Sequence, residues 1–297
     1  MPSPTGRLAV YLSLRSFFAV GGRLPLRLAR AIGPQLGAVA LRLRPRSQKR
    51  VRAHLEIAFP ELDQSQRDAI MCGCSRHFGL MLAEVAWLWH ARADKVENLC
   101  EMVGQHHIFE ALEAGRGAMF ATGHCGNWEL LSARLPIGGV PLISAVRQLD
   151  NKRLDQVVTT LRTRFGTEIV PRGPSAGRRL ARALTKNKVN ALLIDQDIND
   201  IPGVFVPFFG RPAFTPSGAA TLALRMKCPI LPGFIHRRPD GTHLAEIHPP
   251  LPVPTDGTLE DKVEEMTAAA TAVIERQIRA HPEQWVWMHR RWRTRPE

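Results

Sequence analysis

The sequence has few cysteines, and the five present are scattered at Cys72, Cys74, Cys100, Cys125 and Cys228. An odd, scattered set does not form the paired framework of a disulfide-rich secreted domain, so it favours a reducing compartment. Cys72 and Cys74 are separated by one residue, which is poor spacing for zinc, and no second Cys or His pair completes a site. We therefore expect no metal and no cofactor, with the cysteines serving as small core residues.

Long uncharged apolar runs are also missing from the N-terminal region. The longest there, residues 31–41, is much shorter than the roughly 20 residues of a membrane-spanning helix. No small-residue cleavage site follows a clean apolar segment, so a secretory signal is not expected. Arg15, Arg23, Arg27 and Arg30 alternate with Leu, Phe and Val, a pattern typical of a basic segment lying in the interface of an anionic bilayer. We expect residues 1–48 to associate with a membrane without spanning it; the alternative is a basic helix packed on the domain.

Acidic residues are outnumbered, at 27 Asp and Glu against 40 Lys and Arg, which gives a formal charge of +13. Such an excess predicts an anionic partner, which could be a nucleic acid, an anionic membrane, a phosphorylated substrate or an acidic protein. The sequence shows no helix-turn-helix signature, zinc-finger spacing or RNA-binding aromatic motif, so we do not expect nucleic acid. Apolar residues make up 44% of the chain, enough for a substantial core.

The apolar pattern changes character along the chain. The first hundred residues are mainly helical, with one long helix expected over residues 65–90. Short apolar runs then alternate with helical segments. Strands are expected at residues 117–123, 140–146, 167–170, 189–195, 228–235 and 243–248, and helices at 127–135, 153–166, 176–187, 216–226 and 259–281. This alternation predicts an α/β fold, with a mostly parallel central sheet flanked by helices and a helical N-terminal membrane-associating region. We expect one α/β domain over residues 49–297, whose first part, 49–103, is mainly helical.

Three reactive side chains fall at or just past the ends of predicted strands: His124, Arg147 and Asp195. In open α/β sheets the chemistry takes place outside the carboxyl ends of the strands. The sequence therefore predicts a site where these three side chains meet.

The stretch "GHCGNWELL", residues 123–131, places His124 five positions before Glu129. On one helix this offset separates the two side chains by about 140°, so they meet only if His124 lies in a turn before the helix. Asn127 would cap that helix. A histidine held by a carboxylate can remove a proton from a hydroxyl group at neutral pH. The alternatives are a capped helix with a buried histidine, or Cys125 as a nucleophile.

Five ordered blocks extend the pattern: "GHCGNWELL", "AVRQLDNKRLDQVVTTLRTRFG", "LLIDQDIND", "GVFVPFFGRPAFTPSGAATLALRMKCPILPGF" and "HPEQWVWMHRRWR". Together they resemble the bacterial lipid A biosynthesis acyltransferases, from about Arg50 to Arg293. One departure is Cys125, where the family usually has a large aromatic residue. The resemblance implies an acyltransferase that moves a fatty acyl chain from acyl carrier protein to a hydroxyl of a lipid A precursor. It also implies that the enzyme acts at the cytoplasmic face of the bacterial inner membrane, where it is peripheral or anchored through its N-terminus.

The resemblance also implies roles for individual residues. His124 becomes the general base and Glu129 its orienting partner, while Arg147 contacts a substrate phosphate or the thioester carbonyl. Asp195 would hold Arg147 or another basic group in place. The remaining residues implied to bind substrate are Gly126, Asn127 and Arg211.

Several alternatives stay open on the sequence alone. The acceptor could be another phosphorylated glycolipid or membrane lipid, such as a lysophospholipid, an ornithine lipid or a glycosylated phosphatidylinositol. A non-catalytic membrane-surface scaffold would also fit the charge, whereas a hydrolase is disfavoured because no Gly-x-Ser-x-Gly elbow is present. Residues 203–210 could line an acyl channel or pack in the core. Residues 285–293 could lie at lipid headgroups or form a buried segment with a basic end.

Overall fold

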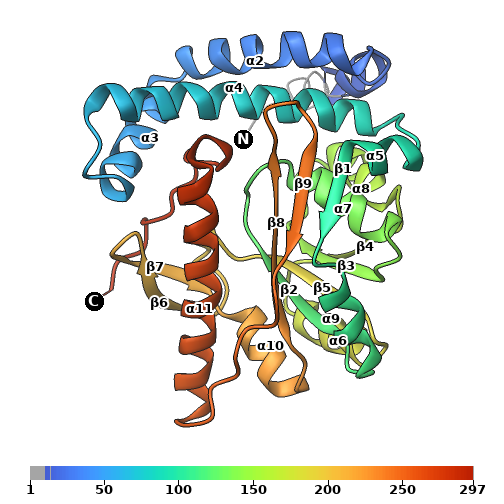
Figure 1. The fold of residues 1–297 in the computed structure, drawn as a ribbon, viewed down its shortest axis with the longest axis vertical. Coiled ribbons are helices and arrows are strands. Elements are labelled where there is room, and N and C mark those ends of the chain that lie inside the picture. The colour runs from blue at the N-terminus through green and yellow to red at the C-terminus, as the bar shows by residue number, and fades with distance from the viewer. Residues whose placement is uncertain (1–10, 14, 297) are drawn as a thin grey trace.

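The computed structural model describes residues 11–13 and 15–296 and is built around a seven-stranded sheet (Figure 1). The strand order is β1-β9-β8-β2-β5-β3-β4, and neighbouring strands are parallel except β8 and β9. The strands are β1 (Cys100–Val103), β2 (Ala118–Thr122), β3 (Leu142–Val146), β4 (Glu168–Pro171), β5 (Val189–Leu193), β8 (Ile230–Arg237) and β9 (His243–Ile247). The mostly parallel α/β sheet predicted from the sequence is confirmed.

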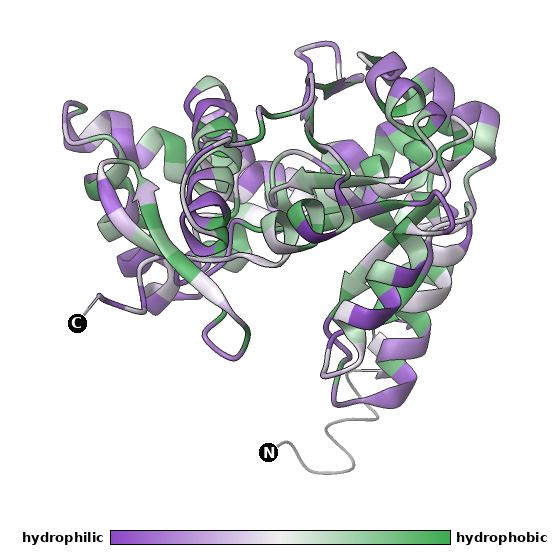
Figure 2. Ribbon diagram, turned by 90° about the horizontal axis from the view of Figure 1, so that it is seen from below, coloured by the Kyte–Doolittle hydropathy of each residue, from purple (hydrophilic) through white to green (hydrophobic). Residues whose placement is uncertain are grey.

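Helices cover both faces of this sheet, because its strands are apolar on both sides. In β2, Met119 and Ala121 join one buried cluster with α10 (Gly218–Met226) and α11 (Leu259–Ala280). The alternating Ala118 and Phe120 join a second cluster with α7 (Trp128–Ile137) and α8 (Lys152–Thr163). The other helices of this part are α6 (His106–Glu113) and α9 (Ala176–Leu184). In Figure 2 many helices show alternating polar and apolar bands, as expected for elements with one solvated and one buried side.

The N-terminal part is helical, as predicted. It comprises η1 (Phe17–Gly21), α2 (Leu26–Arg42), α3 (Pro45–Ala58), α4 (Gln64–Leu88) and α5 (Ala93–Leu99). Helix α2 runs alongside α4 (Figure 1), and glycines allow their backbones to approach closely. A Cβ atom on Gly37 would lie 2.0 Å from the carbonyl oxygen of Ser75, and one on Gly79 would lie 2.1 Å from that of Gly33. Any side chain at these two glycines would force the helices apart.

The outer side of α2 carries an exposed apolar stripe. Leu28, Ile32, Leu36, Val39 and Leu43 recur at helical spacing and are all more than 40% exposed. Among the residues that the structure describes, none of the helices combines the length and the apolar character needed to cross a bilayer. The division of the chain at residue 48, and the membrane role of the part before it, stay predictions.

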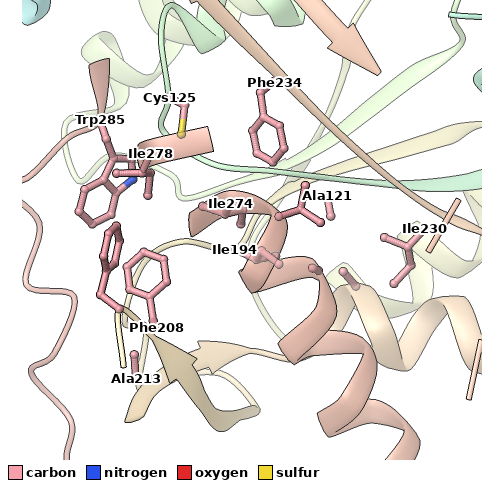
Figure 3. Packing of buried hydrophobic residues seen from close by; sticks show 14 of the residues in the cluster. Ala121, Cys125, Ile194, Phe208, Ala213, Ile230, Phe234, Ile274, Ile278 and Trp285 are labelled. Atoms are coloured by element: carbon pink, nitrogen blue, oxygen red, sulfur yellow. The ribbon is translucent and has the colours of Figure 1, made fainter. Parts of the chain in front are cut away.

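A two-stranded hairpin packs beside the C-terminal segment. It consists of β6 (Gly203–Phe208) and β7 (Arg211–Pro216), and the short helix η2 (Pro282–Gln284) begins the segment that packs against it. Phe208 and Trp285 contact each other in the core, with ring centroids 5.8 Å apart (Figure 3). Trp287 is buried too. Packing in the core is therefore the correct alternative for residues 203–210 and for the tryptophans that begin residues 285–293.

A buried ionic cluster ties the N-terminal helices to the sheet. The Glu84 carboxylate in α4 is fully buried and pairs with Arg30 of α2 and Arg237 of β8. It also lies 3.1 Å from Nε2 of His243 and accepts a 2.9 Å hydrogen bond from the side-chain amide of Asn127. Burial raises the pKa of Glu84, but hydrogen bonds and charges from His243 and Arg237 more than offset this and hold it well below its usual value. Glu84 is therefore an anion that joins four structural elements to the start of α7.

Candidate active site

The register of the central strands brings two of the predicted residues together. Thr122 of β2 pairs with Leu193 of the neighbouring parallel strand β5. His124 and Asp195 each follow two residues later, so they leave the same edge of the sheet side by side. Arg147 follows β3, the next strand beyond β5. The structure confirms that these three residues follow strands ending at one edge of the sheet.

The imidazole of His124 is held by the buried Asp195 carboxylate. Nδ1 of His124 lies 2.7 Å from Oδ1, and the backbone N–H of His124 donates to Oδ2 at 2.7 Å. Oδ2 accepts a further hydrogen bond from the indole N–H of Trp285 at 2.8 Å. Three donors therefore converge on one carboxylate that is only 1% exposed.

These contacts fix the charge of Asp195 and the tautomer of His124. Burial raises the pKa of Asp195, but the neighbouring His124 and the converging N–H donors lower it more, so it lies well below the usual range. An ionised carboxylate at Nδ1 requires the proton on that nitrogen. The lone pair of a neutral His124 is therefore on Nε2, and from there it could accept a proton from a hydroxyl group.

A glutamine and a second histidine complete the polar edge of the site. Nε2 of Gln196 lies 3.0 Å from Nε2 of His124 and 2.8 Å from Nε2 of His289. Burial lowers the pKa of His289 to about 4, with the charge at His124 acting in the same direction. His289 is therefore neutral at pH 7, and the side-chain amide of Gln196 can donate to both rings.

Glu129 has a different place from the one predicted. Its carboxylate accepts hydrogen bonds from the Arg162 guanidinium of α8, with Nε of Arg162 at 3.0 and 3.1 Å from the two oxygens. The prediction that Glu129 orients His124 is corrected on this geometry, because Asp195 takes the position at Nδ1. Asp195 was predicted to hold Arg147 or another basic group, and in the structure the basic group that it holds is the imidazole of His124 rather than Arg147. Glu129 does line the same cavity as His124.

Gly126 and Asn127 build the turn before α7. The Asn127 side chain caps this helix by accepting a hydrogen bond from the backbone N–H of Leu130 at 3.1 Å, as predicted. Gly126 has a φ of +57°, and a Cβ there would lie 1.9 Å from the carbonyl oxygen of Ile235. Asn127 is fully buried against Glu84. The predicted substrate contact of both residues is corrected to a role in shaping the turn.

Arg211 also lies away from the predicted site. It begins β7, pairs in register with Phe208 at the turn of the β6–β7 hairpin, and is exposed. Of the residues that the structure describes, those lining the His124 cavity include neither Arg211 nor the Phe208–Phe209 pair. Arg211 was predicted to bind substrate because it lies in one of the five ordered blocks. It is located at the turn of the β6–β7 hairpin and not at the ends of the central strands.

One large cavity of about 980 Å³ opens at His124. Much of its wall is apolar and is provided by Leu131, Leu135, Leu142, Leu180 and Leu222, among others. Several cationic side chains also line it: Arg147, Arg162, Arg172, Arg178 and Arg225. Such a cavity suits a ligand with a long apolar part and an anionic or strongly polar part.

Cys125 follows His124 but does not share its surroundings. Its side chain lies in the core near Trp285 (Figure 3) and is 4% exposed. Burial raises the pKa of its thiol well above the usual value, and the negative charge of Asp195 adds to this. A thiol held protonated is a poor nucleophile, so the geometry disfavours the Cys125 alternative.

Buried neutral histidines predict a loss of stability in mild acid. Burial lowers the pKa of His77 to about 4, as it does for His289, whereas an unfolded chain has a histidine pKa of about 6.5. Between these values the unfolded state binds more protons, so the free energy of unfolding falls as the pH falls. Each histidine contributes a slope of at most about 1.4 kcal/mol per pH unit.

Urea unfolding at pH 7, 6 and 5 measures this slope. We expect the His77→Gln variant to show a shallower loss of stability between pH 6 and pH 5 than the parent protein. Parallel curves for the two proteins would show that His77 titrates normally in the folded state.

Comparisons with known proteins show the family to which the chain belongs. A model of the family described as bacterial lipid A biosynthesis acyltransferase matches residues 6–294. The chain is 32% identical to the lipid A biosynthesis lauroyltransferase of Escherichia coli, over 93% of this chain and 88% of that protein. It is 26% identical to the palmitoleoyltransferase of the same organism, over 92% and 88%. It is also 29% identical to a phosphatidylinositol mannoside acyltransferase of Mycobacterium tuberculosis, over 76% and 71%. With nearly the whole chain matched, the protein belongs to the bacterial lipid A biosynthesis acyltransferase family.

Proposed function

We propose that the protein transfers a fatty acyl chain from the thioester of acyl carrier protein to a hydroxyl group of a lipid A precursor. Family membership supports an acyltransferase acting on lipid A or a related glycolipid. The observation that carries the proposal is the imidazole of His124, fixed by a buried carboxylate and opening into a large, mainly apolar cavity with arginines in its wall.

The reaction needs no covalent enzyme intermediate. Nε2 of His124 removes the proton from the acceptor hydroxyl while the hydroxyl oxygen attacks the thioester carbonyl carbon. The resulting tetrahedral oxyanion collapses to the ester as the carbon–sulfur bond breaks. The departing thiolate then takes the proton from Nε2. Asp195 stays ionised throughout and stabilises the imidazolium formed in the first step.

The cavity arginines provide the cationic groups that this chemistry uses. Arg147 is exposed at the end of β3 and lines the cavity, so it can contact a substrate phosphate or the thioester carbonyl. Arg162 is neutralised by Glu129, which leaves it a positioning role between α7 and α8. Fork-shaped guanidinium groups bind phosphate oxygens in pairs, which favours a phosphorylated acceptor lipid.

Membrane attachment belongs to the same proposal. The apolar stripe on α2 is flanked by exposed Arg27, Arg42 and Arg44. Apolar side chains bordered by arginine suit the headgroup layer of an anionic bilayer, with the helix lying in its plane. We propose peripheral attachment at the cytoplasmic face of the inner membrane, through residues 1–48.

A glycosylated phosphatidylinositol is the second candidate acceptor. The observation that favours it is the 29% identity to the phosphatidylinositol mannoside acyltransferase, which extends over most of this chain. The same catalytic geometry serves either acceptor, because both provide a hydroxyl group. Mass spectrometry of membrane lipids from cells with and without the gene distinguishes the two by which lipid loses an acyl chain.

Replacing the base tests the enzymatic proposal directly. For His124→Ala we expect kcat to fall by about 10²–10⁴-fold, the usual contribution of general base catalysis. The assay follows thiol release from acyl carrier protein loaded with a lauroyl chain, with lipid A precursor as acceptor. His106→Ala is the matched control, since His106 is exposed at the start of α6. A His124→Ala protein that is folded and fully active would contradict the proposal and favour a non-catalytic scaffold.

A further inference from the structure

Helix α9 and the turn that follows it present a row of unpaired cations to solvent. Arg178, Arg182 and Lys186 lie at four-residue spacing, with Arg179 beside them, and all four are exposed. Within the part of the chain that the structure describes, none of the four has an ion-pair partner. The opposite side of the helix is buried through Leu180, Ala183 and Leu184. The helix thus has one apolar face on the domain and one basic face available to a partner.

This basic face adjoins the catalytic cavity. Arg178 and the preceding residues 172–174 line the cavity that also contains His124. On the neighbouring helix α10, Arg225 is exposed and lines the same cavity. A molecule bound on the outside of α9 would therefore lie beside an opening that leads to the base.

The position of α9 in the fold favours a protein over a bilayer. Helix α2, with its exposed apolar stripe, lies at one end of the long axis in Figure 1, whereas α9 lies toward the other end. The exposed side of α9 carries charged side chains, and among the described residues no exposed large apolar side chain falls within residues 176–186 to insert into a lipid layer. A surface bound to the membrane through α2 would leave the α9 face directed to the aqueous side.

We propose that the exposed face of α9 and its following turn, formed by Arg178, Arg179, Arg182 and Lys186, docks an acidic carrier protein that delivers its acyl thioester into the adjoining cavity. This inference rests on the proposed function, since it assigns a surface to the donor of that reaction. The attraction is electrostatic and acts on the rate at which the two proteins meet. Complementary charge at the rim of an interface raises the association rate, weakens with salt and leaves the chemical step unchanged.

A charge-reversal variant tests the docking face. Arg179 and Arg182 do not line the cavity among the residues that the structure describes, so Arg179→Glu/Arg182→Glu changes the surface and spares the site. With lauroyl acyl carrier protein as donor, we expect kcat/KM to fall about 10- to 100-fold at low salt, with kcat unchanged. With lauroyl-pantetheine, a small uncharged thioester, the variant and parent should react equally.

The matched control is Lys262→Glu/Arg276→Glu. It changes the net charge by the same amount on α11, where Arg276 is exposed and Lys262 is half-buried, and should leave both donors unaffected. Direct titration of the parent protein with acyl carrier protein, followed by fluorescence anisotropy, separates docking from catalysis.

If the parent uses lauroyl-pantetheine but the α9 variant binds the carrier protein as well as the control does, the docking face is wrong. If the variant instead loses binding to anionic phosphatidylglycerol vesicles and keeps carrier binding, the face contacts lipid and the proposal fails. Inactivity of the parent with every thioester would reject the proposed function, whatever the titration shows.

Discussion

Replacing Asp195 by Asn should lower kcat by about 10²–10⁴-fold while leaving the protein folded. The reason is the arrangement of donors around this side chain. Oδ2 faces two N–H groups, from His124 and Trp285, and Oδ1 faces Nδ1 of the imidazole. An asparagine keeps one oxygen for the two N–H groups and turns its NH₂ toward Nδ1. His124 must then accept at Nδ1 and carry its proton on Nε2, which leaves no lone pair for the acceptor hydroxyl.

Glu129→Gln provides the comparison, because the two variants test two different accounts of the site. A glutamine at 129 can still accept hydrogen bonds from Arg162 and does not touch Nδ1 of His124. We expect it to lose less activity than Asp195→Asn. Steady-state rates with the same donor and acceptor decide the point, and a larger loss at Glu129 would restore it as the partner of the base.

The largest effect on stability is expected at Glu84. Glu84→Ala removes the anion shared by Arg30 and Arg237, whose side chains are only 22% and 10% exposed. Breaking a buried ion pair typically costs about 3–5 kcal/mol, because the remaining charge stays buried without compensation. We expect a decrease of that size in the free energy of unfolding, measured by urea denaturation at pH 7.

Asp68→Ala is the matched control for Glu84. Asp68 pairs with Arg52 at 3.0 Å on the surface, where both side chains are more than a third exposed. Surface ion pairs contribute about 0–1 kcal/mol, so this variant should unfold close to the parent midpoint. Equal effects of the two substitutions would mean that solvent reaches the Glu84 cluster.

Much of the fold follows from local pattern. The alternation of apolar runs and helical segments located β2, β3, β5 and the helices between them, because a buried parallel strand reads as a short continuous apolar run. The pattern did not locate β1 or the β6–β7 hairpin. Residues 100–103 alternate in burial, and they pair with β9, which lies more than a hundred residues away. Such pairing is tertiary and leaves little signal in four residues.

The candidate site shows where local reasoning reaches its limit. Proximity in sequence suggested Glu129 as the partner of His124, since five residues and a glycine turn could join them. The actual partner, Asp195, comes from the register of two neighbouring strands, which no single segment encodes. The position of Asp195 at a strand end was the available signal, and it located the residue correctly while leaving its partner open.

Three further residues at the site, Trp285, Gln196 and His289, escaped the sequence reasoning. Gln196 follows Asp195, so its place beside His124 comes from the same strand end. Trp285 and His289 belong to a segment whose tryptophans and arginines suggested either a lipid surface or a core. An indole N–H directed at a buried carboxylate is a specific contact that composition does not predict.

The segment after α11 has a consequence for how the enzyme matures. His124 and Asp195 follow strands β2 and β5, but Trp285 and His289, which complete their surroundings, lie beyond residue 280. A ribosome therefore makes the sheet, His124 and Asp195 before it makes Trp285 and His289. The surroundings of His124 are therefore complete only after the segment beyond residue 280 has been made and has folded back onto the sheet.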